Sequence, residues 1–242
     1  MALQSINPST GKIEKTFNEH TSAEVTAIID SVDKTFHSWR GVQYSERKKS
    51  MLNAAKILRE KKDHYGKILT LEMGKPITQA IAEVEKCALV CEYYADNAEK
   101  ILCEEIIKTD ASQSYVRFDP IGIVLAVMPW NFPFWQVFRF AAPALMAGNA
   151  GVLKHASNVP MSALAIEEIF LNAGFPENLF RTLMIGSTSV EAVIKNTKVK
   201  AATLTGSEPA GRKVAESCGR LLKKTVMELG GSDPFIVLED AD

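Results

Sequence analysis

The residues best placed to do chemistry follow an apolar stretch near the middle of the sequence. Residues 121–128 are apolar and rich in β-branched side chains, which is typical of a buried strand covered on both faces. Residues 129–133 read Pro-Trp-Asn-Phe-Pro, and Pro133 suits the first turn of a helix. Such a turn would hold the Asn131 amide at the carboxyl edge of a parallel sheet, where open α/β folds bind ligands. A stiff turn without a chemical role is the alternative.

Other polar residues stand where further strands are predicted to end. Gly206 and Ser207 open one predicted helix, and Gly186 stands before another, so backbone N–H groups there could face an anion. Lys154 ends a strand, where its ammonium could reach a ribose or a phosphate. Plain turns and a solvated lysine are the alternatives. No G-x-G-x-x-G motif is present, but the shared sheet edge favours a nucleotide.

Glu228 ends the last of these strands and is followed by Leu229 and two glycines. A carboxylate there could act as a general base, because the glycines allow close approach of the backbone. An exposed glutamate before a flexible turn is the alternative.

The elements that must position these residues alternate between strand and helix. Strands are predicted near residues 121–128, 150–154, 180–185, 200–205 and 224–228. Helices are predicted near residues 133–147, 160–173, 188–196 and 207–221, with Gly148, Gly174 and Gly219 as stops. Crossovers of this length predict an α/β fold with a Rossmann-like parallel sheet flanked by helices.

An N-terminal helical region precedes this sheet. Residues 6–18 are predicted to form a strand, a turn and a strand, and Thr21 to Glu24 has the form of a capping box that opens a helix. Further helices are predicted at 45–65 and 77–100. An antiparallel strand at 113–119 and a final strand at 234–238 complete the prediction.

Composition narrows the class of protein. The 242 residues are 46% hydrophobic and 24% charged, and the formal net charge is −1, which gives no electrostatic case for nucleic acid or an anionic membrane. No apolar run has the length of a transmembrane helix, and the N-terminus lacks the build of a signal peptide, so we expect a cytoplasmic protein. The four cysteines have no paired framework, which favours reduced thiols. Cys87 and Cys91 are four residues apart on a predicted helix and could bind a metal, but helix packing is favoured because no His or further Cys stands at ligand spacing.

Four motifs together resemble the NAD(P)-dependent aldehyde dehydrogenase superfamily: residues 129–133, 154–157 (Lys-His-Ala-Ser), 205–207 (Thr-Gly-Ser) and 228–231 (Glu-Leu-Gly-Gly). The resemblance implies oxidation of a small-molecule aldehyde to its acid with NADP or NAD. It also implies a division into N-terminal strands and helices, an oligomerisation strand, a cofactor-binding domain and the start of a catalytic domain, at residues 1–112, 113–120, 121–228 and 229–242.

The same resemblance assigns roles to individual residues. Asn131 would donate its amide to the oxyanion of a thiohemiacetal, and Glu228 would activate the water that hydrolyses the thioester. The residues implied to bind the cofactor are Trp130, Asn131, Lys154, His155, Ala156, Ser157, Gly186, Gly206, Ser207 and Leu229.

Two positions bear on specificity. Ser157 stands where family members restricted to NAD often carry a glutamate, so Lys154 would be free to pair with a 2′-phosphate and NADP is expected to be accepted. Arg139 lies two predicted helical turns beyond Asn131, on the same face of the predicted helix. Residues 135–139 resemble the succinate-semialdehyde dehydrogenases, and the resemblance implies that Arg139 holds the distal carboxylate of succinate semialdehyde. A surface or interface arginine is the alternative.

The family's nucleophile is a cysteine a few dozen residues beyond the position of Glu228, and none of Cys87, Cys91, Cys103 and Cys218 matches it. We therefore expect an incomplete enzyme with uncovered apolar surface near residues 125–150 and 224–238. A non-catalytic NAD(P)-binding remnant and a partner chain that completes a split enzyme are the alternatives. A homo-oligomer is a further expectation from residues 113–119.

Overall fold

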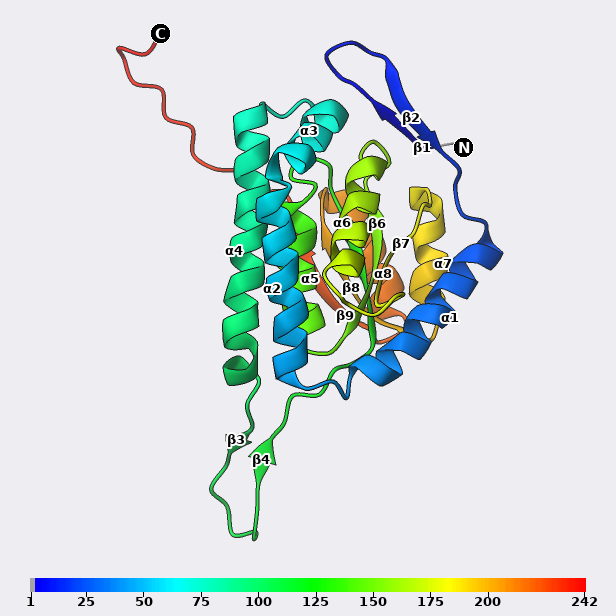
Figure 1. Ribbon diagram of the computed structural model, residues 1–242, viewed down its shortest axis with the longest axis vertical. Coiled ribbons are helices and arrows are strands. Elements are labelled where there is room, and N and C mark those ends of the chain that lie inside the picture. Colours follow the sequence, from blue (N-terminus) through cyan, green and yellow to red (C-terminus); the bar gives the residue numbers. More distant parts are fainter. Residues whose placement is uncertain (1–2) are drawn as a thin grey trace.

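A computed structural model describes residues 3–242 and contains a five-stranded sheet with helices on both faces (Figure 1). All neighbouring strands of this sheet are parallel. Their order is β7 (Phe180–Thr182), β6 (Ala150–His155), β5 (Ile123–Met128), β8 (Val199–Thr205) and β9 (Lys224–Glu228). The predicted α/β fold and the five predicted strands are confirmed.

The register aligns the ends of these strands. Met128 at the end of β5 lies opposite His155 at the end of β6, and Thr205 at the end of β8 lies opposite Glu228 at the end of β9. The carboxyl ends of parallel strands meet at one edge of a sheet, so the candidate residues share that edge as the sequence predicts.

Helices cover the two faces of the sheet unequally. One face carries α5 (Trp135–Met146) and α6 (Pro160–Asn172), and α2 (Tyr44–Glu60), α3 (Lys62–Met73) and α4 (Ile77–Ile101) form a further layer against them. The opposite face carries α1 (Ser22–Trp39), α7 (Val190–Lys195) and α8 (Glu208–Gly219). Short loops join these helices to the strands, as is usual for such layers.

An aromatic cluster fills the space between α5, α6 and the sheet. Phe134 stacks on Phe138, and Phe138 contacts Phe170, with ring centroids 6.2 and 5.1 Å apart. Gly151 of β6 makes room for Phe180, because a Cβ at Gly151 would lie 2.8 Å from the Phe180 ring. These fully or nearly fully buried rings pack α5 and α6 together and against β6 and β7.

The N-terminal helices follow the prediction with one correction. The capping box is present, since the Glu24 N–H donates to the Thr21 hydroxyl at 3.2 Å and the Thr21 N–H donates to the Glu24 carboxylate at 2.7 Å. A single helix over residues 45–65 is wrong. Lys61, with φ −109° and ψ 20°, separates α2 from α3, and the change of direction lets Tyr65 and Leu69 become buried.

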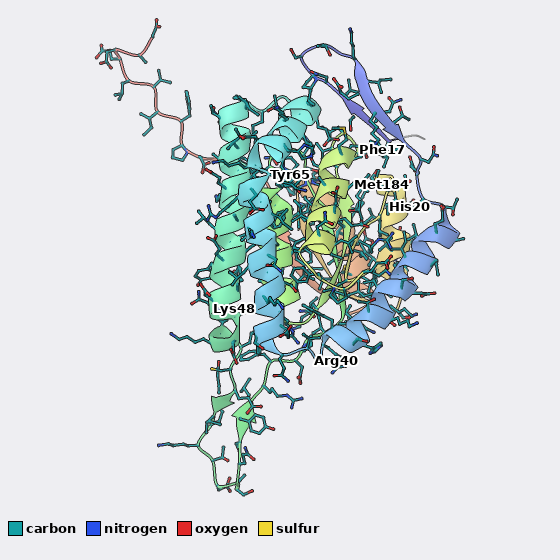
Figure 2. The ribbon with its side chains drawn as sticks, viewed as in Figure 1. Phe17, His20, Arg40, Lys48, Tyr65 and Met184 are labelled. Carbon is teal, nitrogen blue, oxygen red and sulfur yellow. The ribbon has the colours of Figure 1, made fainter. Side chains whose placement is uncertain are left out.

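The segment before α1 is fixed to the sheet. The His20 N–H donates to the Met184 carbonyl at 2.7 Å, and the Met184 N–H donates to His20 Nδ1 at 3.2 Å. Both residues lie together beside Phe17 in Figure 2. This pair joins the end of the hairpin of β1 (Leu3–Ile6) and β2 (Ile13–Phe17) to the chain just after β7.

Two predicted strands are shorter than expected or missing. Residues 113–119 are antiparallel as predicted, but only β4 (Tyr115–Val116) pairs, with β3 (Glu105–Ile106). The strand predicted at 234–238 is wrong, because no segment among residues 3–242 pairs with it. Phe235 and Ile236 there are 91% and 80% exposed.

Apolar exposure near the sheet is partly as predicted. Residues 224–238 expose Val226, Phe235 and their neighbours, whereas residues 134–146 of α5 are mostly buried against the sheet and α4. Within the predicted range 125–150, Trp130 and Phe132 are the large apolar side chains that stay exposed.

The cysteines follow the packing prediction. Cys87 and Cys91 are fully buried in α4, and burial raises the pKa of both thiols. Among residues 3–242, no cluster of three or more His, Cys, Asp or Glu side chains has the geometry to hold a metal. The helices within the same range include none that is long and apolar enough to cross a membrane.

Candidate functional site

The turn that carries Asn131 is held from outside by a buried carboxylate. Glu83 of α4 accepts the N–H groups of Phe134 and Trp135 at 2.9 and 3.0 Å, which satisfies free donors at the start of α5. Lys75 forms an ion pair with Glu83, and both side chains are buried. The negative charge also complements the positive end of the helix dipole. The N-terminal helical region therefore fixes where α5 begins.

Aromatic contacts extend this support to the rest of the turn. The Lys75 Nζ lies 3.6 Å from the centre of the Phe132 ring, and the Lys86 Nζ lies 4.0 Å from the centre of the Trp135 ring. Asn131, which precedes Phe132, is exposed, and its Oδ1 accepts the Phe132 N–H at 3.1 Å. That contact leaves the Asn131 Nδ2 group to donate to a ligand, as an oxyanion donor must.

Sequence reasoning missed Lys75 and Glu83. A usable signal is present, because Glu83 occupies a position of the apolar stripe of α4 between Ala80 and Cys87. A charged residue on a buried stripe requires a partner.

His155 supports the same turn. Its ring is buried, Nε2 donates to the Pro133 carbonyl at 2.9 Å, and Nδ1 accepts the Ala156 N–H at 2.9 Å. These contacts suit the neutral ring, and burial lowers the pKa of His155 to about 4. His155 was predicted to bind the cofactor, but its side chain is turned into the protein and joins β6 to the turn.

Lys154 faces a groove of about 600 Å³ between the sheet, α7 and α8. Val127, Ser187, Leu204 and Lys213 line the same groove. The Lys154 ammonium is mostly buried and makes no hydrogen bond or ion pair with any residue between 3 and 242, and burial lowers its pKa. A buried cation without a counter-charge favours an anion, so the groove fits a phosphate-bearing cofactor.

Ser157, Gly186, Gly206 and Ser207 were also predicted to bind the cofactor, but they are not among the residues that line this groove. Ser157 and Ser207 are exposed, and the Ser207 hydroxyl forms no cap on α8. The Gly206 N–H is not free for a phosphate, because it donates to the Glu228 carbonyl at 3.0 Å. The Glu19 carboxylate lies beside Gly186 and opposes an anion there.

The last three residues predicted to bind the cofactor, Trp130, Ala156 and Leu229, are either partly exposed to solvent or packed against the protein. Trp130 is half exposed at the sheet edge, and Ala156 is half-buried after β6. Leu229 covers α8, since a Cβ on Gly211 would lie 2.5 Å from the Leu229 Cδ2. Its side chain therefore packs on the α8 face of the sheet.

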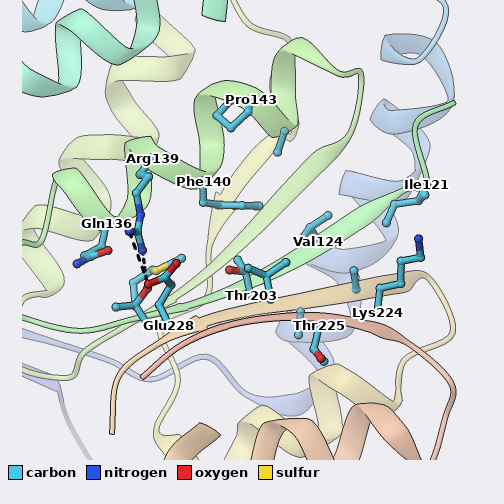
Figure 3. Close-up of a pocket in the computed structure, with 16 residues that line it drawn as sticks. Ile121, Val124, Gln136, Arg139, Phe140, Pro143, Thr203, Lys224, Thr225 and Glu228 are labelled. Carbon is cyan, nitrogen blue, oxygen red and sulfur yellow. Dashed lines mark hydrogen bonds and ion pairs between the residues drawn. The ribbon is translucent and has the colours of Figure 1, made fainter. Parts of the chain in front are cut away.

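Arg139 and Glu228 share a second pocket, of about 530 Å³, on the α5 face of the sheet (Figure 3). The Arg139 Nη1 lies 4.0 Å from the Glu228 Oε2, and the Arg139 Nη2 donates to the Thr205 hydroxyl at 3.3 Å. Gln136 also lines this pocket, and its Oε1 is buried without a hydrogen bond among the described residues.

The prediction that Arg139 and Asn131 lie on the same face of one helix is wrong. Asn131 precedes α5, which begins at Trp135, so the two residues do not share a helical face. Arg139 meets Glu228 because α5 packs over β5 and β6 and the long arginine side chain extends from it to the ends of β8 and β9. Thr205 was missed as its partner.

The parallel sheet, the groove with its unpaired lysine and the amide-bearing turn define a Rossmann-like, cofactor-binding α/β domain. The model of the aldehyde dehydrogenase family matches residues 1–242, and the chain belongs to that family. The resemblance seen in the four sequence motifs is therefore confirmed.

Individual relatives agree with this assignment. The chain is 57% identical over 242 residues to a probable succinate-semialdehyde dehydrogenase (NADP(+)) of Synechocystis sp., and 49% identical over 245 residues to succinate-semialdehyde dehydrogenase (NADP(+)) 1 of Mycobacterium tuberculosis. All of this chain is aligned in both cases, with 53% and 54% of the relatives. The chain thus spans about half the length of the curated relatives it matches.

A solved structure gives the same result. The succinic semialdehyde dehydrogenase of Streptococcus pyogenes, in complex with NADP+, superposes with a TM-score of 0.94 at 41% identity. The superposition covers all of this chain and 53% of that one.

Proposed function

We propose that the chain binds NADP and supplies the oxyanion donor, the general base and the carboxylate-binding arginine for oxidation of succinate semialdehyde to the acid. The observation that carries the proposal is the arrangement of Asn131, Arg139, Lys154 and Glu228 at one sheet edge, on the strands and helix of an aldehyde dehydrogenase fold. The relatives named above have the same cofactor and aldehyde in their names.

The cofactor preference rests on charge. Lys154 is a buried cation without a counter-charge, and the exposed Ser157 places no carboxylate near it. A 2′-phosphate would supply the missing negative charge, so NADP is favoured over NAD. When bound, the cofactor accepts the hydride of the aldehyde carbon.

The residues of the chain divide the remaining work. The Asn131 amide stabilises the negative charge that forms on the aldehyde oxygen after a thiolate attacks. Arg139 holds the distal carboxylate, and Glu228 removes a proton from the water that attacks the thioester.

The nucleophile is not supplied at this edge by the four cysteines. Cys87, Cys91 and Cys218 are buried. Cys103 is exposed but follows α4, and roughly 25 Å of helix separate Glu83, beside the Asn131 turn, from that end of α4. We therefore propose that this chain alone binds NADP without turnover, and that activity requires a thiol from a further polypeptide segment or a partner chain.

The first test is binding of NADP and NAD to the purified chain, followed by calorimetry. NADP is expected to bind at least about tenfold more tightly, the usual consequence of one added charge-assisted contact. Ser157→Glu should reverse the preference by repelling the 2′-phosphate, and Ser157→Ala is the matched control that keeps it. NAD binding at least about tenfold tighter than NADP to the unmodified chain would contradict the proposal.

Three further features belong to the same proposal. The exposed apolar residues of the β3–β4 hairpin, among them Ile106 and Tyr115, support self-association through residues 113–120. A cytoplasmic location is also proposed. The division at residues 112, 120 and 228 is proposed for the domains.

A further inference from the structure

Arg139 makes two contacts at the ends of neighbouring strands. Its Nη2 donates to the Thr205 hydroxyl at 3.3 Å, and its Nη1 lies 4.0 Å from the Glu228 Oε2. Among residues 3–242, Glu228 is the carboxylate that pairs with Arg139. Figure 3 shows the Arg139 guanidinium aimed at Glu228 on the sheet.

We propose that Arg139 restrains Glu228 until a ligand carboxylate enters the pocket, binds the guanidinium and displaces the Glu228 carboxylate from it. This inference rests on the proposed function, in which Arg139 binds the distal carboxylate and Glu228 activates water. Recognition of the ligand and release of the base then depend on the same side chain.

The contact between Arg139 and Glu228 is weak enough for a ligand carboxylate to replace it. The Arg139 and Glu228 side chains are 38% and 56% exposed, and the contact is single and long. An ion pair of this kind shifts an equilibrium by about fivefold at most. A ligand carboxylate can form two parallel hydrogen bonds with a guanidinium and is the stronger partner.

The surrounding contacts limit the exchange to side chains. The Gly206 N–H donates to the Glu228 carbonyl at 3.0 Å, so the end of β9 stays attached to β8. Thr205 holds the other side of the guanidinium. Only the Glu228 side chain has to rotate. An aldehyde without a carboxylate leaves Glu228 paired.

The test measures binding of succinate, a stable dicarboxylate, to the 242-residue chain by calorimetry. Glu228→Gln removes the competing carboxylate and should tighten succinate binding about two- to fivefold. Glu208→Gln is the matched control, because it removes an equal charge from a glutamate at the start of α8 that pairs with Arg212. We expect succinate binding to Glu208→Gln to match that of the unmodified chain.

The outcomes separate this inference from the proposed function. The exchange is overturned if Glu208→Gln tightens succinate binding as much as Glu228→Gln does, or if Glu228→Gln does not tighten it. In either case Arg139 remains a carboxylate site if Arg139→Gln weakens succinate binding. Succinate binding that Arg139→Gln does not change, or no succinate binding by any form, rejects the carboxylate site and the exchange together.

Discussion

At the scale of single residues, four buried charged or titratable groups near the sheet edge differ in how they are paired. Glu83 and Lys75 neutralise each other, His155 is held neutral by two hydrogen bonds, and Lys154 has no partner among the described residues. The first three side chains are fully used in holding the turn. Lys154 alone is left to bind an anion, which is why it is the best single candidate for cofactor recognition.

The His155 ring predicts a pH dependence of stability. Burial lowers its pKa from 6.5 to about 4, so the unfolded chain binds a proton in this range and the folded chain does not. The stability from a neutral His155 is fully present above pH 6.5 and is lost as the pH falls to about 4. The difference is worth about 3 kcal/mol.

Urea unfolding at a series of pH values measures this effect. His155→Gln keeps a donor and an acceptor but does not titrate, so it should lose less stability than the unmodified chain between pH 6.5 and 4. Parallel pH profiles for the two proteins would show that His155 is not the group responsible.

At the scale of elements, the start of α5 depends on α4. Glu83→Gln should lower the free energy of unfolding by about 3–5 kcal/mol, because Lys75 is left as an unpaired buried charge. Thermal and denaturant unfolding would measure the loss.

A double variant is the control for this prediction. Lys75→Met combined with Glu83→Gln removes both charges and keeps an oxygen that accepts the Phe134 and Trp135 N–H groups. It should be more stable than Glu83→Gln alone. If the double variant is the less stable of the two, the ion pair is not the source of the effect.

At the scale of the whole molecule, the exposed apolar side chains concentrate in residues 226–238 and on the β3–β4 hairpin. Phe235 and Ile236 make almost no packing contact with the rest of the chain, so they add little to its stability and favour association.

Phe235→Asp should therefore reduce association, measured by light scattering over a range of protein concentrations. The melting temperature should stay within about 1–2 °C, because the side chain is 91% exposed. Phe235→Leu is the matched control and should associate as the unmodified chain does. A large fall in melting temperature for Phe235→Asp would mean that this side chain is packed in solution.

The sequence by itself determined where the strands and helices of the sheet lie along the chain, and the edge of the sheet at which the candidate residues meet. Apolar runs and glycine stops mark strands and helices through local periodicity, and parallel crossovers then bring Asn131, Lys154 and Glu228 to one edge. The four motifs also identified the family, which the match over residues 1–242 confirms.

The tertiary structure decided which of these side chains are available. His155 is turned inward, the Gly206 N–H is used by Glu228, and Arg139 reaches Glu228 and not the Asn131 turn. Contacts of this kind join residues far apart in the chain, so no local pattern contains them. Strand pairing at 234–238 likewise depends on a neighbouring strand, because an apolar run supplies side chains for a sheet but no partner for its backbone.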